Sequence, residues 1–333
     1  MRQDPAGGLP AIPVLELGTA APVAMVEAER ARTLSLVAAA TRFVPRPALQ
    51  AADHLSRRWL ERADTPYLPE IAAVAEALGQ PGGWFLNACY EWGCTSAVGP
   101  LPGKETNRLI RVLDWTLAGL GKTIVAARRA GPAGPWTDLT WPGYSGVIQA
   151  LAPGRFAAAF NQAPMHVKGS GYLLDWARNR HAVWRRPALP PAHLLRRVFD
   201  QAASYAQAKT WLVETPLALP AIFLICGPKA GEACVIERLE DHAEVIEGPA
   251  AAANHWQRVE RPSRPRGAGS PGRRDQLARD QGSAGDDFAW LRPPVLNPTT
   301  RLAMTAEPAT GNLKAQGFEK DGPATAVLCL NEA

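Results

Sequence analysis

LNACYEWGCTSAVG, residues 86–99, marks the point at which helical sequence gives way to short strands. Cys94 lies at this junction, between Gly93 and two hydroxyl residues. A thiol at the start of a strand can act as a nucleophile if a base takes its proton, and the same sulfur can attack the peptide bond before it. Because a cysteine in an apolar strand is more often inert packing, Cys94 indicates chemistry only if it has partners.

The sequence before this junction predicts mainly helices, and the sequence after it predicts short strands. The first 90 residues contain a predicted strand at 14–18 and predicted helices over 23–42, over 48–62 and from Pro69 to Gly79. After the junction, short apolar runs separated by Gly and Pro predict consecutive strands that are antiparallel neighbours joined by hairpin turns. These runs are 94–100, 108–115, 122–130, 136–143, 144–152 and 155–164.

A second helical block is predicted over 171–214, and strands return after it. The later strands are predicted between 221 and 256 and at 300–304, 313–317 and 324–330, with a short helix at 273–279. This order is poor for a doubly wound sheet, in which strands and helices alternate. We therefore predict an α+β protein with two antiparallel sheets covered by helices.

The composition is that of a globular protein able to bury a large core. Among 333 residues, 47% are hydrophobic and 20% are charged, which excludes a disordered chain or a coiled coil. The net charge of +5 does not indicate a nucleic-acid partner. The segment Arg258–Arg279 holds seven arginines but no interleaved aromatic residues, and we expect a solvated loop there.

The sequence carries no sign of a membrane span, a metal site or a cofactor. The longest apolar run, 217–226, is too short to cross a bilayer and contains Pro220. An acidic residue and early Gly and Pro near the start indicate no export signal, so we expect a cytoplasmic protein. The cysteines are odd in number and include no CxxC pair, which predicts neither a disulfide framework nor a zinc site. They are Cys89, Cys94, Cys226, Cys234 and Cys329.

RLIRVLDWT, residues 108–116, places Arg111 and Asp114 in the strand expected to pair with the Cys94 strand. Charges within such an apolar strand are costly to bury unless they are paired or used. A mutual salt bridge is the simplest alternative. Residues three apart on a regular strand point to opposite faces, so both reach one site only at a bulge or a strand end.

Five short segments then follow one another in order: CTS at 94–96, RVLDW at 111–115, WPGYSGV at 141–147, APGRFAAAFNQ at 152–162 and NHW at 254–256. In this order they resemble the acid ceramidase and N-acylethanolamine acid amidase group of N-terminal-nucleophile hydrolases. More distant relatives are the bile salt hydrolases, penicillin V acylase and the acyltransferase that makes penicillins from 6-aminopenicillanic acid. The resemblance runs from residue 86 to RRD at 273–275 and implies a four-layer αββα sandwich.

The resemblance also implies an inactive precursor that cleaves its own Gly93–Cys94 bond. The products would be a helical α chain, residues 1–93, and a catalytic β chain, residues 94–333, which stay associated as one integrated domain. Cleavage gives Cys94 a free α-amino group with an unperturbed pKa of about 7.7 to 8.0. This amine is a general base attached to the nucleophile itself, so no histidine need be catalytic.

Roles for three further residues are implied by the same resemblance. Asp114 matches the aspartate that orients the Cys94 amine. Arg111 matches the arginine near the sulfur, where a fixed cation favours the thiolate and can contact the substrate carbonyl. Asn254 matches the asparagine whose side-chain NH₂ stabilises the tetrahedral oxyanion.

Asn161, Gln162 and Arg273 are implied to support the substrate or the oxyanion, with Arg274 as the alternative to Arg273. In the mammalian relatives an aspartate stands at the place of Asn161 and a glutamate at that of Gln162, so this site lacks two potential negative charges. An acid optimum or an acid trigger for cleavage is therefore not expected to carry over. The long Arg-Pro-Gly loop between Asn254 and Arg273 also departs from the family pattern.

We therefore predict a self-processing amidase that hydrolyses a linear, non-peptide amide of an N-acyl compound through a Cys94 thioester. An N-acyl lipid, an N-acyl amino acid, an acyl-homoserine lactone and a β-lactam side chain all present such an amide, and the choice stays open. Acyl transfer from the same thioester is one alternative. A noncatalytic relative that binds a small acylated ligand is another, and a papain-like cysteine protease is the least favoured.

Overall fold

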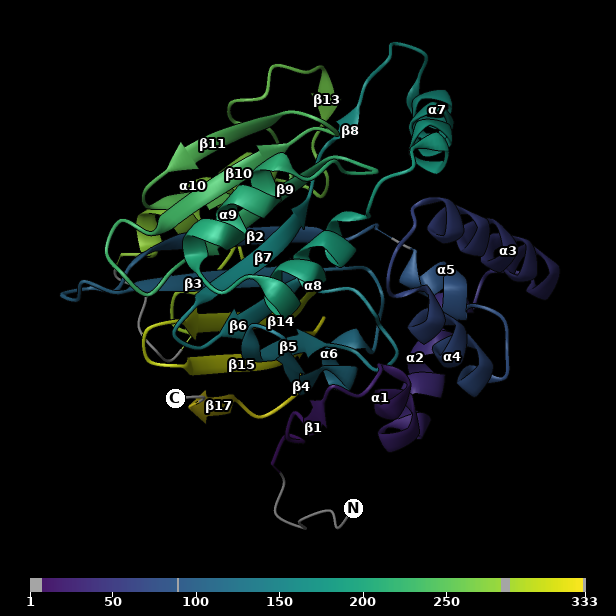
Figure 1. Ribbon diagram of the computed structural model, residues 1–333, viewed down its shortest axis with the longest axis horizontal. Coiled ribbons are helices and arrows are strands. Elements are labelled where there is room, and N and C mark those ends of the chain that lie inside the picture. Colours follow the sequence, from purple (N-terminus) through teal and green to yellow (C-terminus); the bar gives the residue numbers. More distant parts are fainter. Residues whose placement is uncertain (1–7, 89, 283–287, 332–333) are drawn as a thin grey trace.

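The computed structural model describes residues 8–88, 90–282 and 288–331, and its centre is a pair of β-sheets (Figure 1). The first sheet has the strand order β1-β4-β5-β6-β7-β9-β10-β11. Its strands are β1 (Val14–Gly18), β4 (Val125–Gly131), β5 (Gly134–Thr140), β6 (Gln149–Ala152), β7 (Phe156–Gln162), β9 (Ala221–Cys226), β10 (Ala233–Arg238) and β11 (Ala243–Glu247).

The second sheet has the order β12-β2-β3-β14-β15-β16, with β17 also paired to β15. Its strands are β2 (Gly93–Pro100), β3 (Asn107–Asp114), β12 (Ala250–Ala252), β14 (Thr300–Glu307), β15 (Asn312–Glu319), β16 (Gly322–Pro323) and β17 (Leu328–Asn331). A separate two-stranded ribbon joins β8 (Met165–His166) to β13 (Ser263–Arg264).

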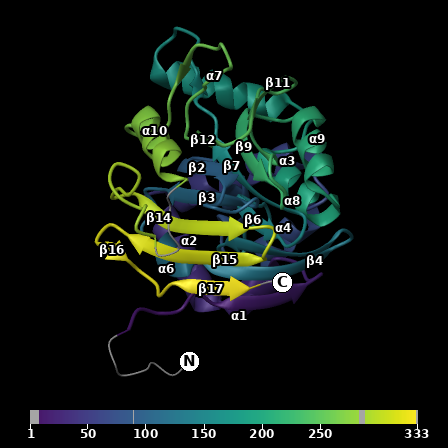
Figure 2. The ribbon, with the colours of Figure 1, turned by 90° about the vertical axis from the view of Figure 1, so that its left-hand side faces the viewer.

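Helices cover the outer faces of both sheets. On the first sheet, α8 (Pro191–Gln201) packs on β4, β5 and β7, and α9 (Tyr205–Glu214) packs on β9 and β10. On the second, α10 (Ser270–Asp280) packs on β2 and β12, and α6 (Leu120–Thr123) packs on β14 and β15. Figure 2 shows α10 on one side, α8 and α9 on the other, and the sheets between them. The predicted αββα sandwich is confirmed.

The remaining helices come mostly from the first 90 residues and gather beside the sandwich (Figure 1). They are α1 (Val23–Ala28), α2 (Arg30–Thr41), α3 (Arg46–Arg62), α4 (Leu68–Leu78) and α5 (Gly83–Asn87), with α7 (Tyr172–Arg185) from the second helical block. The single helix predicted over 23–42 is wrong, because Glu29 leaves the helical backbone (φ −119°, ψ 36°) and divides it in two. Helix α4 ends as expected, with Gly79 in the left-handed conformation at φ 65°.

The predicted run of neighbouring antiparallel strands is wrong at one place. Strands β2 and β3 form a hairpin in the second sheet, and β4 to β7 form a meander in the first. The chain crosses between the sheets after Asp114, and the second neighbour of β3 is β14, which is nearly two hundred residues away in sequence. Strand β1 also departs from the antiparallel pattern, because it pairs with β4 in parallel.

The prediction of a solvated loop over Arg258–Arg279 is wrong for much of its length. The segment contributes β13 and most of α10, and it buries the side chain of Arg273. Within the described ranges, no helix is long and apolar enough to cross a membrane. The described cysteines Cys94, Cys226, Cys234 and Cys329 are free thiols, and Cys89 lies outside the described residues.

Candidate active site

Cys94 is the second residue of β2, and its side chain is completely buried between the sheets. In the β2–β3 hairpin Cys94 pairs with Leu113, and Ser96 pairs with Arg111. Residues opposite each other and residues two apart on a strand share a face, so the side chains of Cys94, Ser96 and Arg111 point to the same side. The first sheet lies on that side, where β2 and β3 pack against β7.

Arg111 is a buried cation whose guanidinium contacts the sulfur. Its Nη2 donates to Cys94 Sγ at 3.0 Å and its Nε donates to Gln149 Oε1 at 2.7 Å. Its Nη1 donates to Asn161 Oδ1 at 2.5 Å and to Ser96 Oγ at 3.2 Å. These hydrogen-bond partners are neutral side chains and the Cys94 sulfur, and the Asp114 carboxylate acts on the charge of Arg111 from nearby.

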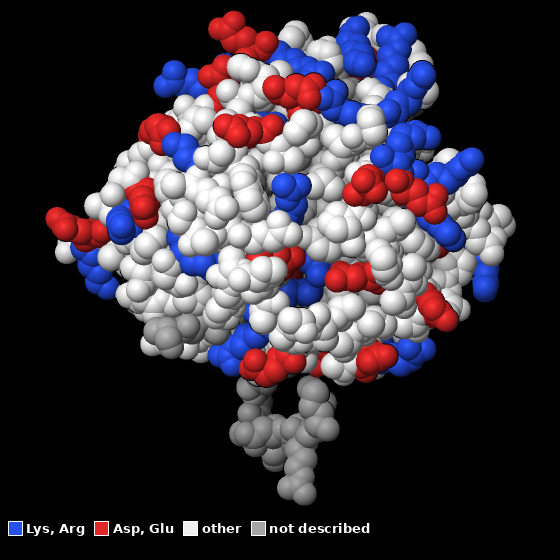
Figure 3. Space-filling model, in the orientation of Figure 1, with Lys and Arg blue, Asp and Glu red and all other residues white. Residues whose placement is uncertain are grey.

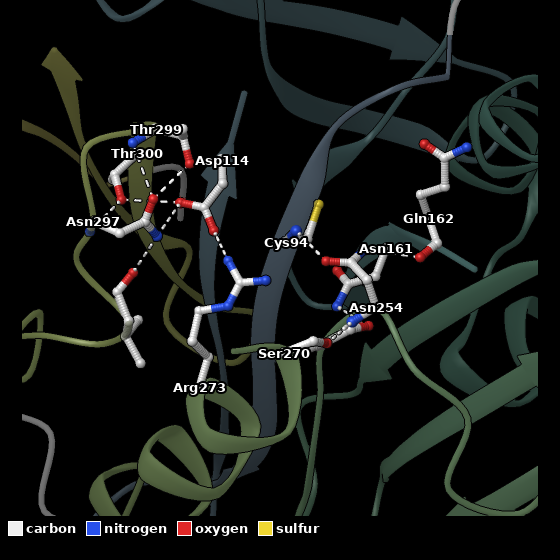
Figure 4. A network of polar contacts seen from close by, with 12 residues as sticks. Cys94, Asp114, Asn161, Gln162, Asn254, Ser270, Arg273, Asn297, Thr299 and Thr300 are labelled. Atoms are coloured by element: carbon white, nitrogen blue, oxygen red, sulfur yellow. Dashed lines mark hydrogen bonds and ion pairs between the residues drawn. The ribbon is translucent and has the colours of Figure 1, made fainter. Parts of the chain in front are cut away.

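Asn161 and Gln162 end strand β7 opposite this cluster. Asn161 accepts from Ser96 Oγ at 2.9 Å and donates through Nδ2 to the Ala252 carbonyl at 3.1 Å, so its amide is fixed with the oxygen toward Arg111. The backbone of Gln162 hydrogen-bonds to the Cys94 sulfur. Its side-chain oxygen is buried without a partner among the described residues, and Figure 4 shows the side chain pointing away from Cys94. Gln162 therefore acts on the sulfur through its main chain.

Asn254 holds the peptide nitrogen of Cys94 (Figure 4). Its Oδ1 accepts from the Cys94 N–H at 2.7 Å, and its Nδ2 donates to the Gln162 carbonyl at 2.8 Å. Its own backbone N–H donates to Ser270 Oγ at 2.9 Å, which fixes the loop after β12 to the start of α10. A side-chain amide has two N–H groups, so one donor of Asn254 remains beyond the contact with Gln162.

Asp114 is the last residue of β3 and pairs with Gly93, the residue before the nucleophile. The register of β14 shifts directly opposite, between Thr300 and Leu302. Of the two arrangements expected for Arg111 and Asp114, the structure shows the strand end, because Asp114 ends β3 and the register shift lies in the neighbouring strand β14. The Asp114 carboxylate accepts from Arg273 Nη1 at 2.5 Å, Thr300 Oγ1 at 2.9 Å and Asn297 Nδ2 at 3.0 Å. With about four lone-pair sites on a carboxylate, one acceptor position remains.

Of the two candidate arginines, Arg273 lies against Asp114 and Arg274 points elsewhere. Arg274 donates to Gln257 Oε1 at 2.9 Å and pairs with Asp275 at 2.7 Å. Arg273 is almost fully buried, and its Nε and Nη2 have no hydrogen-bond partner in the described part of the chain.

Burial dominates the electrostatics of the site. It raises the pKa of the Cys94 thiol to about 11, although the Arg111 guanidinium acts to lower it. It lowers the pKa of Arg111, against the effect of Cys94, and raises the pKa of Asp114, against the effect of Arg273. The intact chain at neutral pH therefore holds a protonated thiol beside a cation that favours the thiolate.

A cleft of about 620 Å³ opens next to the nucleophile without reaching it. Its wall includes Glu91, Trp92 and Gly93 but not Cys94. Trp92 is held in place by aromatic neighbours, with ring centroids 5.6 Å from Trp115 and 5.8 Å from Phe160. The residues just before the Gly93–Cys94 bond thus stand between the sulfur and the cleft.

Four members of the network were not foreseen from the sequence: Gln149, Ser270, Asn297 and Thr300. Gln149 could have been singled out, because a glutamine within the apolar run at 147–152 is costly to bury, as is Arg111 in its own strand. Asn297 and Thr300 could not have been singled out, because their hydrogen bonds to Asp114 depend on the pairing of β3 with β14.

Comparison with curated proteins finds acid ceramidases. The chain is 32% identical to acid ceramidase of Homo sapiens over 101 residues and 32% identical to that of Heterocephalus glaber over 99 residues. Each match covers 30% of this chain and 24% of the relative, so the chain spans about a quarter of the length of the curated relatives it matches. No protein-family model matches the chain.

Comparison with solved structures finds the N-acylethanolamine-hydrolyzing acid amidase ortholog of Caenorhabditis elegans. The TM-score is 0.52 at 16% sequence identity, over 71% of this chain and 99% of that one. At this identity the likeness concerns the fold. The resemblance expected from the sequence is thereby confirmed: in fold over most of its length, and in sequence over a shorter segment, the chain resembles the acid ceramidase and N-acylethanolamine acid amidase group of N-terminal-nucleophile hydrolases.

Proposed function

We propose that the protein is a cysteine amidase that hydrolyses the amide bond of N-acyl compounds after it has cut its own Gly93–Cys94 bond. The observation that carries this proposal is the contact of Arg111 Nη2 with Cys94 Sγ at 3.0 Å, by a guanidinium whose other hydrogen-bond partners are neutral. Similarity to acid ceramidases and the shared fold of an amidase support an amide as the substrate.

The first step is self-cleavage. Cys94 Sγ attacks the carbonyl carbon of Gly93, the peptide nitrogen leaves with the thiol proton, and a thioester joins Gly93 to the Cys94 side chain. Water then hydrolyses the thioester, which releases the Gly93 carboxylate and restores the thiol. Asn254 Oδ1 already holds the departing nitrogen through its N–H, at 2.7 Å. The same oxygen and the free acceptor position on Asp114 can bind the new amine of Cys94.

In substrate hydrolysis the Cys94 amine takes the place of a separate base. It accepts the thiol proton, the thiolate attacks the substrate carbonyl, and the resulting ammonium returns the proton to the leaving amine. Arg111 stabilises the thiolate. The second N–H of Asn254 is the donor available to the tetrahedral oxyanion, and the Gln162 carbonyl fixes its direction. Water finally releases the acyl group from the thioester.

The two chains produced by cleavage are expected to stay together through a buried polar cluster. Residues 1–93 supply Tyr67 and Glu70, and residues 94–333 supply Arg196 and Asp200. Arg196 pairs with both oxygens of Glu70, through Nη2 at 3.0 Å, and lies 4.1 Å from the centroid of the Tyr67 ring. The Tyr67 hydroxyl donates to Asp200 Oδ2 at 3.1 Å. These contacts do not depend on the Gly93–Cys94 bond.

Glu70→Ala should destabilise the protein by about 2 to 3 kcal/mol, because it removes the carboxylate that accepts from two nitrogens of the buried Arg196 and leaves the more distant Asp200, at 3.7 Å, as the carboxylate beside it. The figure is below that of a fully buried pair, since Glu70 is about a quarter exposed. Glu76→Ala, on the exposed side of the same helix, is the matched control. Urea unfolding measures the difference, and gel filtration of the cleaved protein reports whether the chains separate. Equal unfolding midpoints for the two variants would remove this role from Glu70.

The proposed function is tested by incubating processed protein with N-acyl amides of several acyl lengths and following the release of acid and amine. Wild type should release both, and intact-mass analysis should find the acyl group on residues 94–333. Cys94→Ala should do neither. If the acyl group appeared on an added amine instead of as free acid, the protein would be the acyltransferase alternative. No turnover of any amide by processed protein would overturn the proposal.

A further inference from the structure

Three arginines line the cleft beside the Gly93–Cys94 bond: Arg264, Arg266 and Arg273. All three come from the arginine-rich segment Arg258–Arg279, and Arg264 and Arg266 lie in its part that departs from the family pattern in sequence. The carboxylates in the same wall are Glu91 and Asp114, and Asp114 is engaged by Arg273. The charge of this wall is therefore set by whether Glu91 stays in it.

Glu91 bridges two guanidiniums in the intact chain. Its Oε2 accepts from Arg266 Nη1 at 2.8 Å, and its Oε1 accepts from Arg180 Nη2 at 2.9 Å. A second contact fixes Arg266, because its Nε donates to the Ala163 carbonyl at 3.0 Å. A carboxylate carried by the segment next to the cleaved bond thus occupies a site built from α7 and the loop after β13. When cleavage frees the end of that segment, Glu91 can leave, whereas Arg180 and Arg266 remain on elements of the β chain.

Two arginines of this wall, Arg264 and Arg273, have charge or donors without a partner among the described residues. The Arg273 side chain is only 4% exposed, yet its Nε and Nη2 lack a partner among the described residues. Arg264 lies at 5.2 Å over the ring of Tyr172 and has no carboxylate partner within the described ranges. Figure 3 shows Lys and Arg side chains gathered over α7 and the adjoining β13 region. Buried guanidinium donors without partners favour an anion with two acceptor oxygens.

We propose that the mature cleft binds N-acyl compounds that carry a carboxylate, with Arg266 as its principal ligand and Arg264 and Arg180 as supporting cations. Glu91 is the internal occupant of this site before cleavage. The inference rests on the proposed amide hydrolysis and adds the class of substrate. The carboxylate can lie on the amine half or on the acyl half of the amide, and the two are separated by experiment.

The test uses three amides that share a ten-carbon acyl chain. N-decanoylethanolamine is neutral, N-decanoylglycine has its carboxylate on the amine half, and decanedioic acid monoethanolamide has it on the acyl half. Processed wild-type protein should hydrolyse one of the acidic amides with kcat/KM about tenfold or more above that of the neutral one. The acidic amide that is preferred identifies the half that faces Arg266.

Arg266→Gln should remove most of this preference, because the KM for the acidic amide should rise by about tenfold and the KM for the neutral amide should rise much less. Arg264→Gln changes an exposed side chain and should give a smaller rise in the same KM. Arg258→Gln, an exposed arginine of the same segment outside the cleft, is the control. Equal rates on all three amides, or a loss in Arg266→Gln that is the same for each, would overturn the inference and leave the amidase standing. No hydrolysis of any of the three would overturn both.

Discussion

Arg111→Met is expected to slow amide hydrolysis by about two to three orders of magnitude while the chain remains folded. The guanidinium is the cation in contact with Cys94 Sγ, and a cation this close lowers the pKa of a neighbouring thiol by about 1 to 3. Without it the thiolate at neutral pH becomes correspondingly scarcer. Loss of one hydrogen-bond donor from the reacting centre lowers kcat by a factor of similar size.

Arg238→Met is the matched control for this substitution. Arg238 is also almost fully buried, but it donates to the carbonyls of Leu212 and Thr215 at the end of α9, and neither of these contacts involves the nucleophile. Both variants should lose stability, and only Arg111→Met should shift the pH dependence of Cys94 alkylation in processed protein to higher pH. An alkylation profile unchanged in Arg111→Met would contradict the assigned role.

The second large effect concerns cleavage itself. The purified wild-type chain should convert to two chains, and Cys94→Ala should remain whole, because the attacking sulfur is then absent. The pKa of the thiol in the intact chain is raised to about 11, so the thiolate fraction increases about tenfold for each pH unit between 6 and 9. Cleavage should therefore accelerate with rising pH. A rate that falls as pH rises would exclude this thiolate as the attacking group.

Site residues whose chemistry is unusual for their strand could be predicted from the local sequence. Arg111 and Asp114 stand out because charge in an apolar strand demands an explanation, and the hairpin that pairs them with Ser96 and Gly93 is short enough to predict. The four-layer αββα sandwich was predicted from the order of the five motifs, through the family that they resemble. The cysteine and its strand alone would not have indicated this architecture.

What could not be predicted depends on pairing between distant segments. The chain leaves one sheet for the other after Asp114, and nothing in the turn there distinguishes this from another hairpin. Asn297 reaches Asp114 only because β14 lies beside β3, and Arg273 is buried only because α10 packs on β2. Composition made the arginine-rich segment look solvated. The burial of Arg273 within it depends on Asp114, a charge on a strand far away in the sequence.

The most direct test of the account is intact-mass spectrometry of the purified 35.7 kDa chain beside Cys94→Ala, after incubation across a range of pH. The account predicts that wild type yields a fragment of about 26 kDa that begins at Cys94, with a partner ending at Gly93, and that the variant yields neither. A wild-type chain that stays whole at every pH would contradict it, because the Cys94 amine would then never form.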